Sequence, residues 1–243
     1  GAAACGLGGG HGGRLAMDLG GDRQFECDRF VAGPTHWPCF ADATNEMIGM
    51  TSSQISEAER ITIEDTQRWL MQAVVGLNLC PFAKAVVTKN LVRYRVCLSA
   101  EPADVLNMLR EELQHLSSKD EALLDTTLLI APHLLPDFFE FNAFLSDCDE
   151  VLLDLNLEGV LQIADFHPHY TFAGEDPQGM SHFTNRTPYP TLHLLRESSI
   201  DKAVAAYPDA ALIYERNMAL LEKMGHEGWK TLGLQARVTD TAQ

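Results

Sequence analysis

The chain has 243 residues, of which 46% are hydrophobic, 21% charged and 8% aromatic, a globular composition that excludes the disordered and fibrous classes. No run approaches the ~18 apolar residues of a membrane-spanning helix, so we expect a soluble protein that does not enter a membrane. The 18 basic and 34 acidic residues give a net charge of −16, which repels phosphate backbones and argues against binding to nucleic acid.

Acidic residues are concentrated in the middle of the chain. Residues 101–160 hold fourteen acidic residues and two basic ones. Solvated helix faces account for such a bias in most proteins, and the alternative is an acidic face that docks a basic partner. Both interpretations stay open at this point.

Six cysteines, at positions 5, 27, 39, 80, 97 and 148, form no C-x-x-C pair and match no zinc-binding spacing. A chain of this length can bury a core without disulfides, so we expect a reducing compartment, the cytoplasm. The alternative is an organelle, a plastid or a mitochondrion. The first seventeen residues contain one arginine and no acidic residue, as the remainder of a targeting peptide would.

Residues 1–58 are predicted to be an extension outside the folded domain. The first 21 residues are rich in Gly and Ala and cannot bury enough apolar surface to order themselves. Residues 22–58 show no clear helical or strand period. We therefore expect one α/β domain over residues 59–230, followed by a tail at 231–243.

Apolar periodicity predicts alternating helices and strands from about Thr62 onward. A first helix begins there, a second after Ser99 with Pro102 in its first turn, and a third at Pro136. Strands are predicted at 91–98, 126–131 and 160–166. Each connection is long enough to join parallel neighbours. The expected fold class is therefore α/β, with a small parallel sheet of about three strands, crossover helices and a helical C-terminus.

A long irregular stretch follows the third strand, from residue 167 to residue 191. It contains four prolines, and a loop of this length within a compact domain is usually functional or disordered. Helical structure is expected again after it. Ser199 is predicted to begin a short helix that Pro208 stops, and Asp209 to begin a last helix that Gly225 closes.

Histidines follow two of the predicted strands. His133 comes after the second strand, and His167 and His169 come after the third, where a spacing of two directs both side chains to one side of an extended chain. In a parallel sheet these positions meet at the ligand-binding edge. Two imidazoles so placed can hold a divalent metal with a third histidine, for which the candidates are His133, His182 and His193. The alternative is that they hydrogen-bond carbonyl groups of the loop, with Asp165 orienting a histidine or capping the turn.

Cys80 lies in the segment LCPFAK at 79–84 and is the candidate nucleophile. If a helix begins here, Cys80 is its N-cap residue and Pro81 its first residue. The positive end of the helix and Lys84, one turn further on, would then favour the thiolate. The alternative is a small buried apolar residue, which describes most free cysteines.

The segment NRTPYPTLHLLRE at 185–197 carries the candidate anion-binding residues. Arg186 offers a planar fork of N–H donors that suits a carboxylate or a phosphate. His193 and Arg196 are three residues apart, which places them on one face if this segment is a helix. A cationic pocket that attracts a small anion into an acidic protein is predicted to consist of Asn185, Arg186, His193, Arg196, His167 and Tyr170. The alternative is a set of polar contacts that order the loop.

Four segments resemble a widespread bacterial family of uncharacterised proteins, a domain of unknown function that is also present in plants and algae. They are GLNLCPFAK (76–84), TTLLIAP (126–132), HPHYTFAG (167–174) and NRTPYPTLHLLRE (185–197). The resemblance covers residues 60–225 and implies no activity, cofactor or catalytic residue. The family commonly has Asp at the position of His169, so the resemblance does not imply a two-histidine metal site.

The sequence supports three hypotheses for the function. The first is an enzyme acting on a small anionic molecule, with His167 as general acid or base and Cys80 as nucleophile. The second is a metal-dependent enzyme that uses His167 and His169, and the third is a non-enzymatic binding or assembly module with an acidic docking face. The candidate catalytic residues are Cys80, His167, Tyr170 and His193, and the candidate substrate-binding residues are Asn185, Arg186 and Arg196. Dinucleotide and nucleoside-triphosphate sites are not supported, because neither glycine-rich signature follows a predicted strand.

Overall fold

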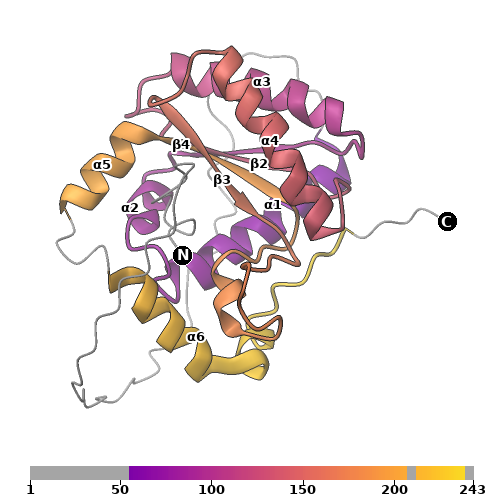
Figure 1. The fold of residues 1–243 in the computed structure, drawn as a ribbon. Helices are drawn as coiled ribbons and strands as arrows, with labels where there is room; N and C mark the ends of the chain where they lie inside the picture. The colour runs from indigo at the N-terminus through magenta and orange to yellow at the C-terminus, as the bar shows by residue number, and fades with distance from the viewer. Residues whose placement is uncertain (1–54, 207–211, 239–243) are drawn as a thin grey trace. The chain divides into compact units, whose positions relative to one another are not determined.

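The computed structural model describes residues 55–206 and 212–238, and these residues form an α/β fold with a helical C-terminus, as predicted (Figure 1). Most of the predicted extension, residues 1–54, lies outside the described residues. The elements in chain order are α1 (Glu57–Trp69), the π-helix η2 (Leu70–Val75), α2 (Ala83–Thr88), β1 (Val92–Val96), α3 (Pro102–Ser118), β2 (Thr126–Ile130), α4 (Phe138–Asp154), β3 (Leu161–Phe166), the 3-10 helix η3 (Met180–Thr184), β4 (Thr191–Arg196), α5 (Glu197–Ala206) and α6 (Leu212–Lys230).

The sheet contains the three predicted strands and a fourth strand that the sequence did not reveal. The strand order is β1-β2-β4-β3. β1 and β2 are parallel, whereas β4 is antiparallel to both β2 and β3. The predicted strands β1, β2 and β3 therefore all run in the same direction, and β4 returns between two of them.

The helical interpretation of residues 192–197 is wrong, because residues 191–196 form β4. His193 lies opposite Leu128 of β2 and Ala164 of β3. Successive side chains of a strand point to opposite faces, so His193 and Arg196, three residues apart, lie on opposite faces of the sheet. The error has a physical source, since a short apolar run that is buried on both faces has no period that separates a strand from a helix.

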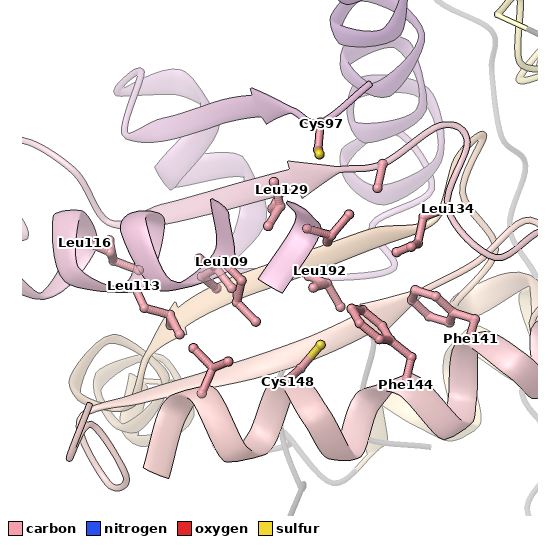
Figure 2. Close-up of a cluster of buried hydrophobic side chains, with 14 of the residues drawn as sticks. Cys97, Leu109, Leu113, Leu116, Leu129, Leu134, Phe141, Phe144, Cys148 and Leu192 are labelled. Atoms are coloured by element: carbon pink, nitrogen blue, oxygen red, sulfur yellow. The ribbon is translucent and has the colours of Figure 1, made fainter. Parts of the chain in front are cut away.

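Helices cover both faces of the sheet (Figure 1). On one face, α3 and α4 pack on the sheet around Leu109, Leu113, Phe141, Cys148 and Leu192, and we call this group the α4-side core (Figure 2). On the other face, α1, η2 and α6 cover a second group, the α1-side core, which includes Trp69, Leu128, Phe166 and Leu221. Within the described part of the chain, no helix combines the length and apolar character that crossing a membrane requires.

Several helix ends differ from those predicted by one or a few residues. α1 begins at Glu57 after the N-cap residue Ser56, whose side chain forms a capping box with Glu59. Asp137 rather than Pro136 precedes the first residue of α4, and its carboxylate accepts the N–H groups of Phe139 and Glu140. Three further expectations concern Ser99, Ser199 and Gly225. Glu101 takes the N-cap position predicted for Ser99, and Ser199 lies inside α5. Gly225 has a non-helical backbone with a φ of 63°, so the helix that begins at Leu212 is interrupted there as predicted, and a second helical segment follows it to Lys230. Pro208 and Asp209 lie outside the described residues.

The turn that ends η2 depends on Gly76. A Cβ atom at Gly76 would lie 2.4 Å from the carbonyl oxygen of Gln72 and 3.1 Å from that of Met71. In an ordinary helix, Ala is more favourable than Gly by about 1 kcal/mol. We expect the opposite sign here, a loss of about 1–3 kcal/mol in the free energy of unfolding for Gly76→Ala, because a backbone oxygen cannot move aside. Urea denaturation measures the change. A gain in stability would contradict the close approach of the Gln72 carbonyl to Gly76 at the end of η2.

Candidate functional site

The loops at the carboxyl ends of β2 and β3 form the candidate site, and we call this region the carboxyl edge. It consists of residues 131–137 after β2 and residues 167–190 between β3 and β4. Because β4 is antiparallel to its neighbours, the loop that enters it lies at the same edge. The N–H of Ala131 donates to the carbonyl of Pro190 over 2.9 Å and joins the two loops. Ligands of open α/β sheets bind at such an edge.

His167 is buried, and both of its ring nitrogens are engaged by the backbone. Its Nδ1 accepts the N–H of His169 over 3.1 Å, so the proton is on Nε2, which donates to the carbonyl of Leu135 over 3.2 Å. The ring also contacts Phe138 and Phe141 of α4. Burial lowers the pKa of His167 to about 4, so the ring is neutral near pH 7. These contacts tie the two loops together, and a role in proton transfer would require them to break.

The carbonyl that His167 binds belongs to a strained residue. Leu135 has a φ of 39°, in a region that residues with a side chain rarely adopt. Such a conformation persists only where the surrounding contacts fix it, and it is most often found near functional sites. The hydrogen bond from His167 is one of the contacts that fix Leu135.

His182 has the same arrangement as His167. It is buried, its Nδ1 accepts the N–H of Phe172 over 3.1 Å, and its Nε2 donates to the carbonyl of Asp176 over 2.7 Å. Two buried histidines thus fasten the irregular loop by bonds to its backbone. This is the structural alternative that the sequence left open for this loop.

The predicted metal site is not assembled by the described residues. In residues 55–206 and 212–238, no three His, Cys, Asp or Glu side chains are grouped as metal ligands would be. His169 is exposed, and His133 is partly buried in the loop after β2. Because the backbone occupies both nitrogens of His167, the set of His167, His169 and His133 lacks its central ligand.

Arg186 is presented by an otherwise buried segment. From residue 180 to residue 192 it is the only residue that is not buried. Its Nε donates to the carbonyl of Tyr170 over 3.2 Å, and its guanidinium carbon lies 4.4 Å from the centre of the Phe183 ring. Burial lowers the pKa of Arg186, although a guanidinium remains charged. No carboxylate among the described residues forms an ion pair with it, although the chain has 34 acidic residues.

Asn185 fixes the backbone next to Arg186. Its side-chain amide donates to the carbonyl of Asp165 over 3.3 Å, and its side-chain oxygen accepts the hydroxyl of Thr184. Its own carbonyl accepts the N–H of His167 over 3.2 Å. Asn185, predicted to bind substrate, therefore attaches the Arg186 loop to the end of β3.

Asp165 is a candidate that the sequence interpretation undervalued. It lies on the same side of β3 as Leu161, toward the α4-side core. Burial raises the pKa of its carboxyl group, and the charge of Asp149 adds to the effect. Burial and the charge of Asp165 both raise the pKa of Tyr170. A single acidic residue in the mostly apolar strand LQIADF was the signal in the sequence.

Tyr170 connects this carboxyl group with the arginine. Its ring packs against Phe138 and Phe172, with centroids 4.8 and 5.0 Å away. Its carbonyl accepts the Nε–H of Arg186. Tyr170 therefore lies between α4 and the Arg186 loop at the carboxyl edge.

Cys80 is not at a helix N-cap. α2 begins at Ala83 and its N-cap residue is Phe82, so the helix end does not activate the thiol as predicted. Cys80 is partly buried and packs against the α1-side core. His167 contacts α4, on the other face of the sheet. The described contacts therefore do not bring the sulfur and this imidazole together.

His193 lies within the sheet, away from the loops of the carboxyl edge. The hydroxyl of Thr126 donates to the carbonyl of Leu194 over 2.6 Å, so it accepts the Nε2–H of His193 over 2.7 Å. Burial lowers the pKa of His193 to about 4. Its ring lies on the same face of the sheet as Phe166, 6.1 Å away. These contacts make His193 a neutral hydrogen-bond donor in the middle of β4.

Arg196 is buried at the other end of β4 from Arg186. Its side chain donates to the carbonyls of Leu116 (2.6 Å), Lys119 (2.7 Å) and Leu124 (3.2 Å). These carbonyl groups belong to the last turn of α3 and to the segment that leads from α3 to β2. Arg196 is the last residue of β4, and Arg186 lies in the loop before the first, so the length of the strand separates the two arginines and they do not share an anion.

The acidic middle of the chain has mixed roles. Glu112 is buried and forms a bidentate pair with Arg93, and Asp137 caps α4. Most of the other acidic residues between 101 and 160 are exposed. A docking face for a basic partner stays a prediction.

The fold and the edge define an α/β protein with a mixed four-stranded sheet and a candidate anion site built from loops. Residues 61–231 match the family described as "Protein of unknown function (DUF1415)", and the chain belongs to this family. The predicted resemblance is therefore confirmed, and it transfers no activity. Searches of the curated proteins and of the solved structures found no match.

Proposed function

We propose that this domain is an enzyme that binds a small anionic molecule at the carboxyl edge of its sheet, with Arg186 holding the anionic group. One observation carries the proposal: a partly buried guanidinium has no carboxylate partner among the described residues of a protein with a net charge of −16. A desolvated charge is costly unless it is paired, and an anion that binds there would supply the missing partner.

The rigidity of the loop supports the same proposal. Buried residues flank Arg186 on both sides, and Asn185 attaches the loop to β3. A cation held in place before the ligand arrives loses less conformational entropy on binding. Preorganisation of this kind is typical of binding and catalytic sites.

Asp165 and Tyr170 are the proposed groups for proton transfer. A carboxyl group with a raised pKa is suited to general acid–base work near neutral pH. The proposal keeps Arg186 and Tyr170 from the predicted set. It replaces His167 and Cys80 by Asp165, because the backbone engages the imidazole and the thiol packs against the α1-side core.

The test is the stabilisation of the protein by anions. We expect phosphate, sulfate or small dicarboxylates at millimolar concentration to raise the melting temperature of the wild-type chain. Arg186→Met should weaken this binding about 10- to 100-fold, since hydrogen bonds to charged groups are worth about 1.5–3 kcal/mol. Asp165→Asn should keep the binding, because its role is in proton transfer.

Arg110→Met is the matched control for the anion experiment. Arg110 is an exposed arginine of α3 that pairs with Asp154, so its loss changes the net charge equally without touching the carboxyl edge. Equal anion-induced shifts in Arg186→Met and in the wild-type chain would refute the proposal.

A further inference from the structure

The segment after α6 lies against the α1-side core, and we call residues 232–238 the C-terminal strap. Leu234 is buried, and Leu232, Ala236 and Val238 pack against the same core. The strap begins with a turn in which Gly233 has a φ of 61°. Apolar contacts alone would hold such a short segment only weakly, so its polar contacts decide where it lies.

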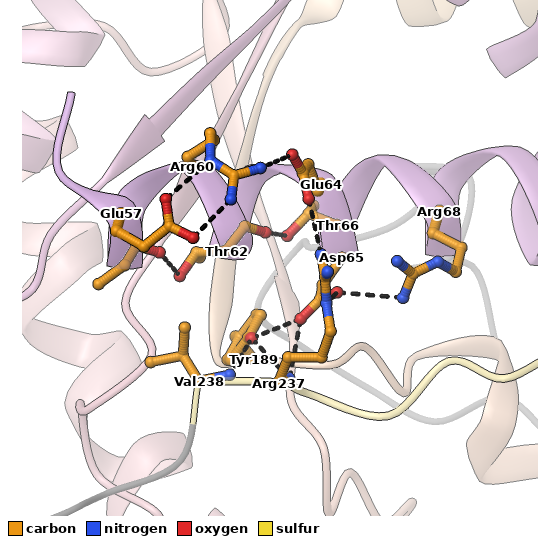
Figure 3. A network of polar contacts seen from close by, with 11 residues as sticks. Glu57, Arg60, Thr62, Glu64, Asp65, Thr66, Arg68, Tyr189, Arg237 and Val238 are labelled. Atoms are coloured by element: carbon orange, nitrogen blue, oxygen red, sulfur yellow. Dashed lines mark hydrogen bonds and ion pairs between the residues drawn. The ribbon is translucent and has the colours of Figure 1, made fainter. Parts of the chain in front are cut away.

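A buried carboxylate of α1 anchors the strap (Figure 3). Asp65 accepts the backbone N–H of Arg237 over 2.8 Å and its Nε–H over 2.5 Å. Arg68 donates to the same carboxylate over 3.1 Å. Burial alone would raise the pKa of Asp65, but hydrogen bonds from Tyr189 and Arg237 outweigh it and the pKa is lowered. Asp65 is therefore an ionised acceptor at neutral pH.

The hydroxyl of Tyr189 joins the strap to the loop that enters β4. It donates to Asp65 over 2.7 Å and accepts the N–H groups of Arg237 (3.1 Å) and Val238 (2.9 Å). All these partners lie on α1 or on the strap. Tyr189 is thus the residue through which both elements hold the loop.

Tyr189 lies three residues after Arg186, and the chain between them is tightly bonded. The carbonyl of Tyr189 accepts the hydroxyls of Thr187 (2.6 Å) and Thr191 (2.8 Å). On the other side of Arg186, Asn185 bonds to the end of β3. The Arg186 backbone is therefore fastened by β3 before it and, after it, by the strap together with the bond from Ala131 to the carbonyl of Pro190.

We propose that the C-terminal strap positions Arg186 for anion binding, with Tyr189 as the positioning residue. This inference rests on the proposed function of Arg186. While the strap is docked, the Arg186 loop is held in one conformation. When the strap is released, the loop gains conformational freedom and binding an anion must order it again, so the affinity falls although Arg186 itself is unchanged.

The test compares Tyr189→Phe with the wild-type chain in two measurements. Hydrogen exchange followed by mass spectrometry reports the freedom of residues 185–191, and titration with inorganic phosphate reports the affinity. Removal of the hydroxyl takes away the donor to Asp65 of α1 and the acceptor of two backbone N–H groups of the strap. We expect faster exchange in 185–191 and a dissociation constant for phosphate raised about five- to tenfold.

Two further variants separate positioning from general destabilisation. Arg237→Ala removes the side-chain bonds to Asp65 and Glu64 but keeps the backbone N–H groups, so we expect the same two effects at smaller size. It also serves if Tyr189→Phe does not fold. Lys202→Ala is the control, because Lys202 of α5 pairs with Glu121 and shares no partner with the strap. We expect it to change neither measurement.

The outcomes distinguish this inference from the proposed function. Unchanged exchange in residues 185–191 of Tyr189→Phe overturns the inference, and so does faster exchange with an unchanged phosphate affinity. If the wild-type chain binds no phosphate or other small anion, the proposed function fails and the inference fails with it. If binding depends on Arg186 but not on Tyr189 or Arg237, the function stands and only the inference is lost.

Discussion

Lowering the pH from 7 to 4 is expected to destabilise the folded chain through His167 and His193. Burial lowers the pKa of both imidazoles to about 4, whereas the unfolded chain takes up these protons near pH 6.5. Between these values the unfolded state binds more protons than the folded state, so the free energy of unfolding rises with pH. The loss therefore begins as the pH falls below 6.5 and levels off below 4. It reaches about 3 kcal/mol for each imidazole at the limit.

Urea denaturation at several pH values between 4 and 7 measures this slope. His193→Gln and His167→Gln remove one titrating group each and should each flatten the slope. Asp165 has the opposite effect on the free energy of unfolding. Because its pKa is raised, the folded chain takes up this proton before the unfolded chain does as the pH falls, which stabilises the folded state. His226→Gln is the control, because the His226 side chain of α6 is exposed and its ring contacts Phe183 instead of the two buried imidazoles. A slope that the His193 and His167 variants leave unchanged would show that other groups cause the acid sensitivity.

Replacing Arg196 by Met is expected to lower the free energy of unfolding by about 2–4 kcal/mol. The guanidinium satisfies the carbonyls of Leu116, Lys119 and Leu124 at the end of α3 and before β2. Met fills a similar volume but offers no donor, so these carbonyls lose their partner in a buried place. A cation at the carbonyl end of a helix is also favoured by the helix dipole, and this contribution is lost too.

Thermal and urea unfolding of Arg196→Met give the magnitude, and anion titration gives the specificity. We expect the affinity for phosphate to stay unchanged, because Arg196 and Arg186 lie at opposite ends of β4. Lys202→Met is the matched control. Lys202 of α5 forms an exposed ion pair with Glu121, and its loss should lower the free energy of unfolding by less than about 0.5 kcal/mol. Equal stability of the two variants would contradict the structural role of Arg196.

The three parallel strands were predictable because turns or helices bound their apolar runs. β4 was missed because its sequence, TLHLLR, is nearly continuous in apolar residues and carries His193 and Arg196 at a helical spacing. Its partners are β2, more than sixty residues earlier, and β3. Pairing over such a distance is decided by the tertiary fold and leaves no local signal.

Residue types in the candidate site were easier to predict than their roles. Arg186 could be identified as a cation that suits an anion, but the lack of a carboxylate partner depends on how distant loops pack. The sequence does not indicate the partners of the two ring nitrogens of His167. The loop geometry shows that they form hydrogen bonds with the backbone of Leu135 and His169. The hydrogen bond between Arg237 and Tyr189 joins residues 48 positions apart, and no local sequence pattern predicts it.

The place of β4 between β2 and β3 has a consequence for synthesis of the protein. β1 and β2 leave the ribosome first and can pair directly, but β3 has no neighbour in the sheet until residues 191–196 have also emerged. For some thirty residues of translation, the nascent chain therefore carries a finished but unpaired strand, which is the kind of segment that chaperones shield from aggregation. A stop codon anywhere before Thr191 would leave β3 with no strand to join it to the rest of the sheet.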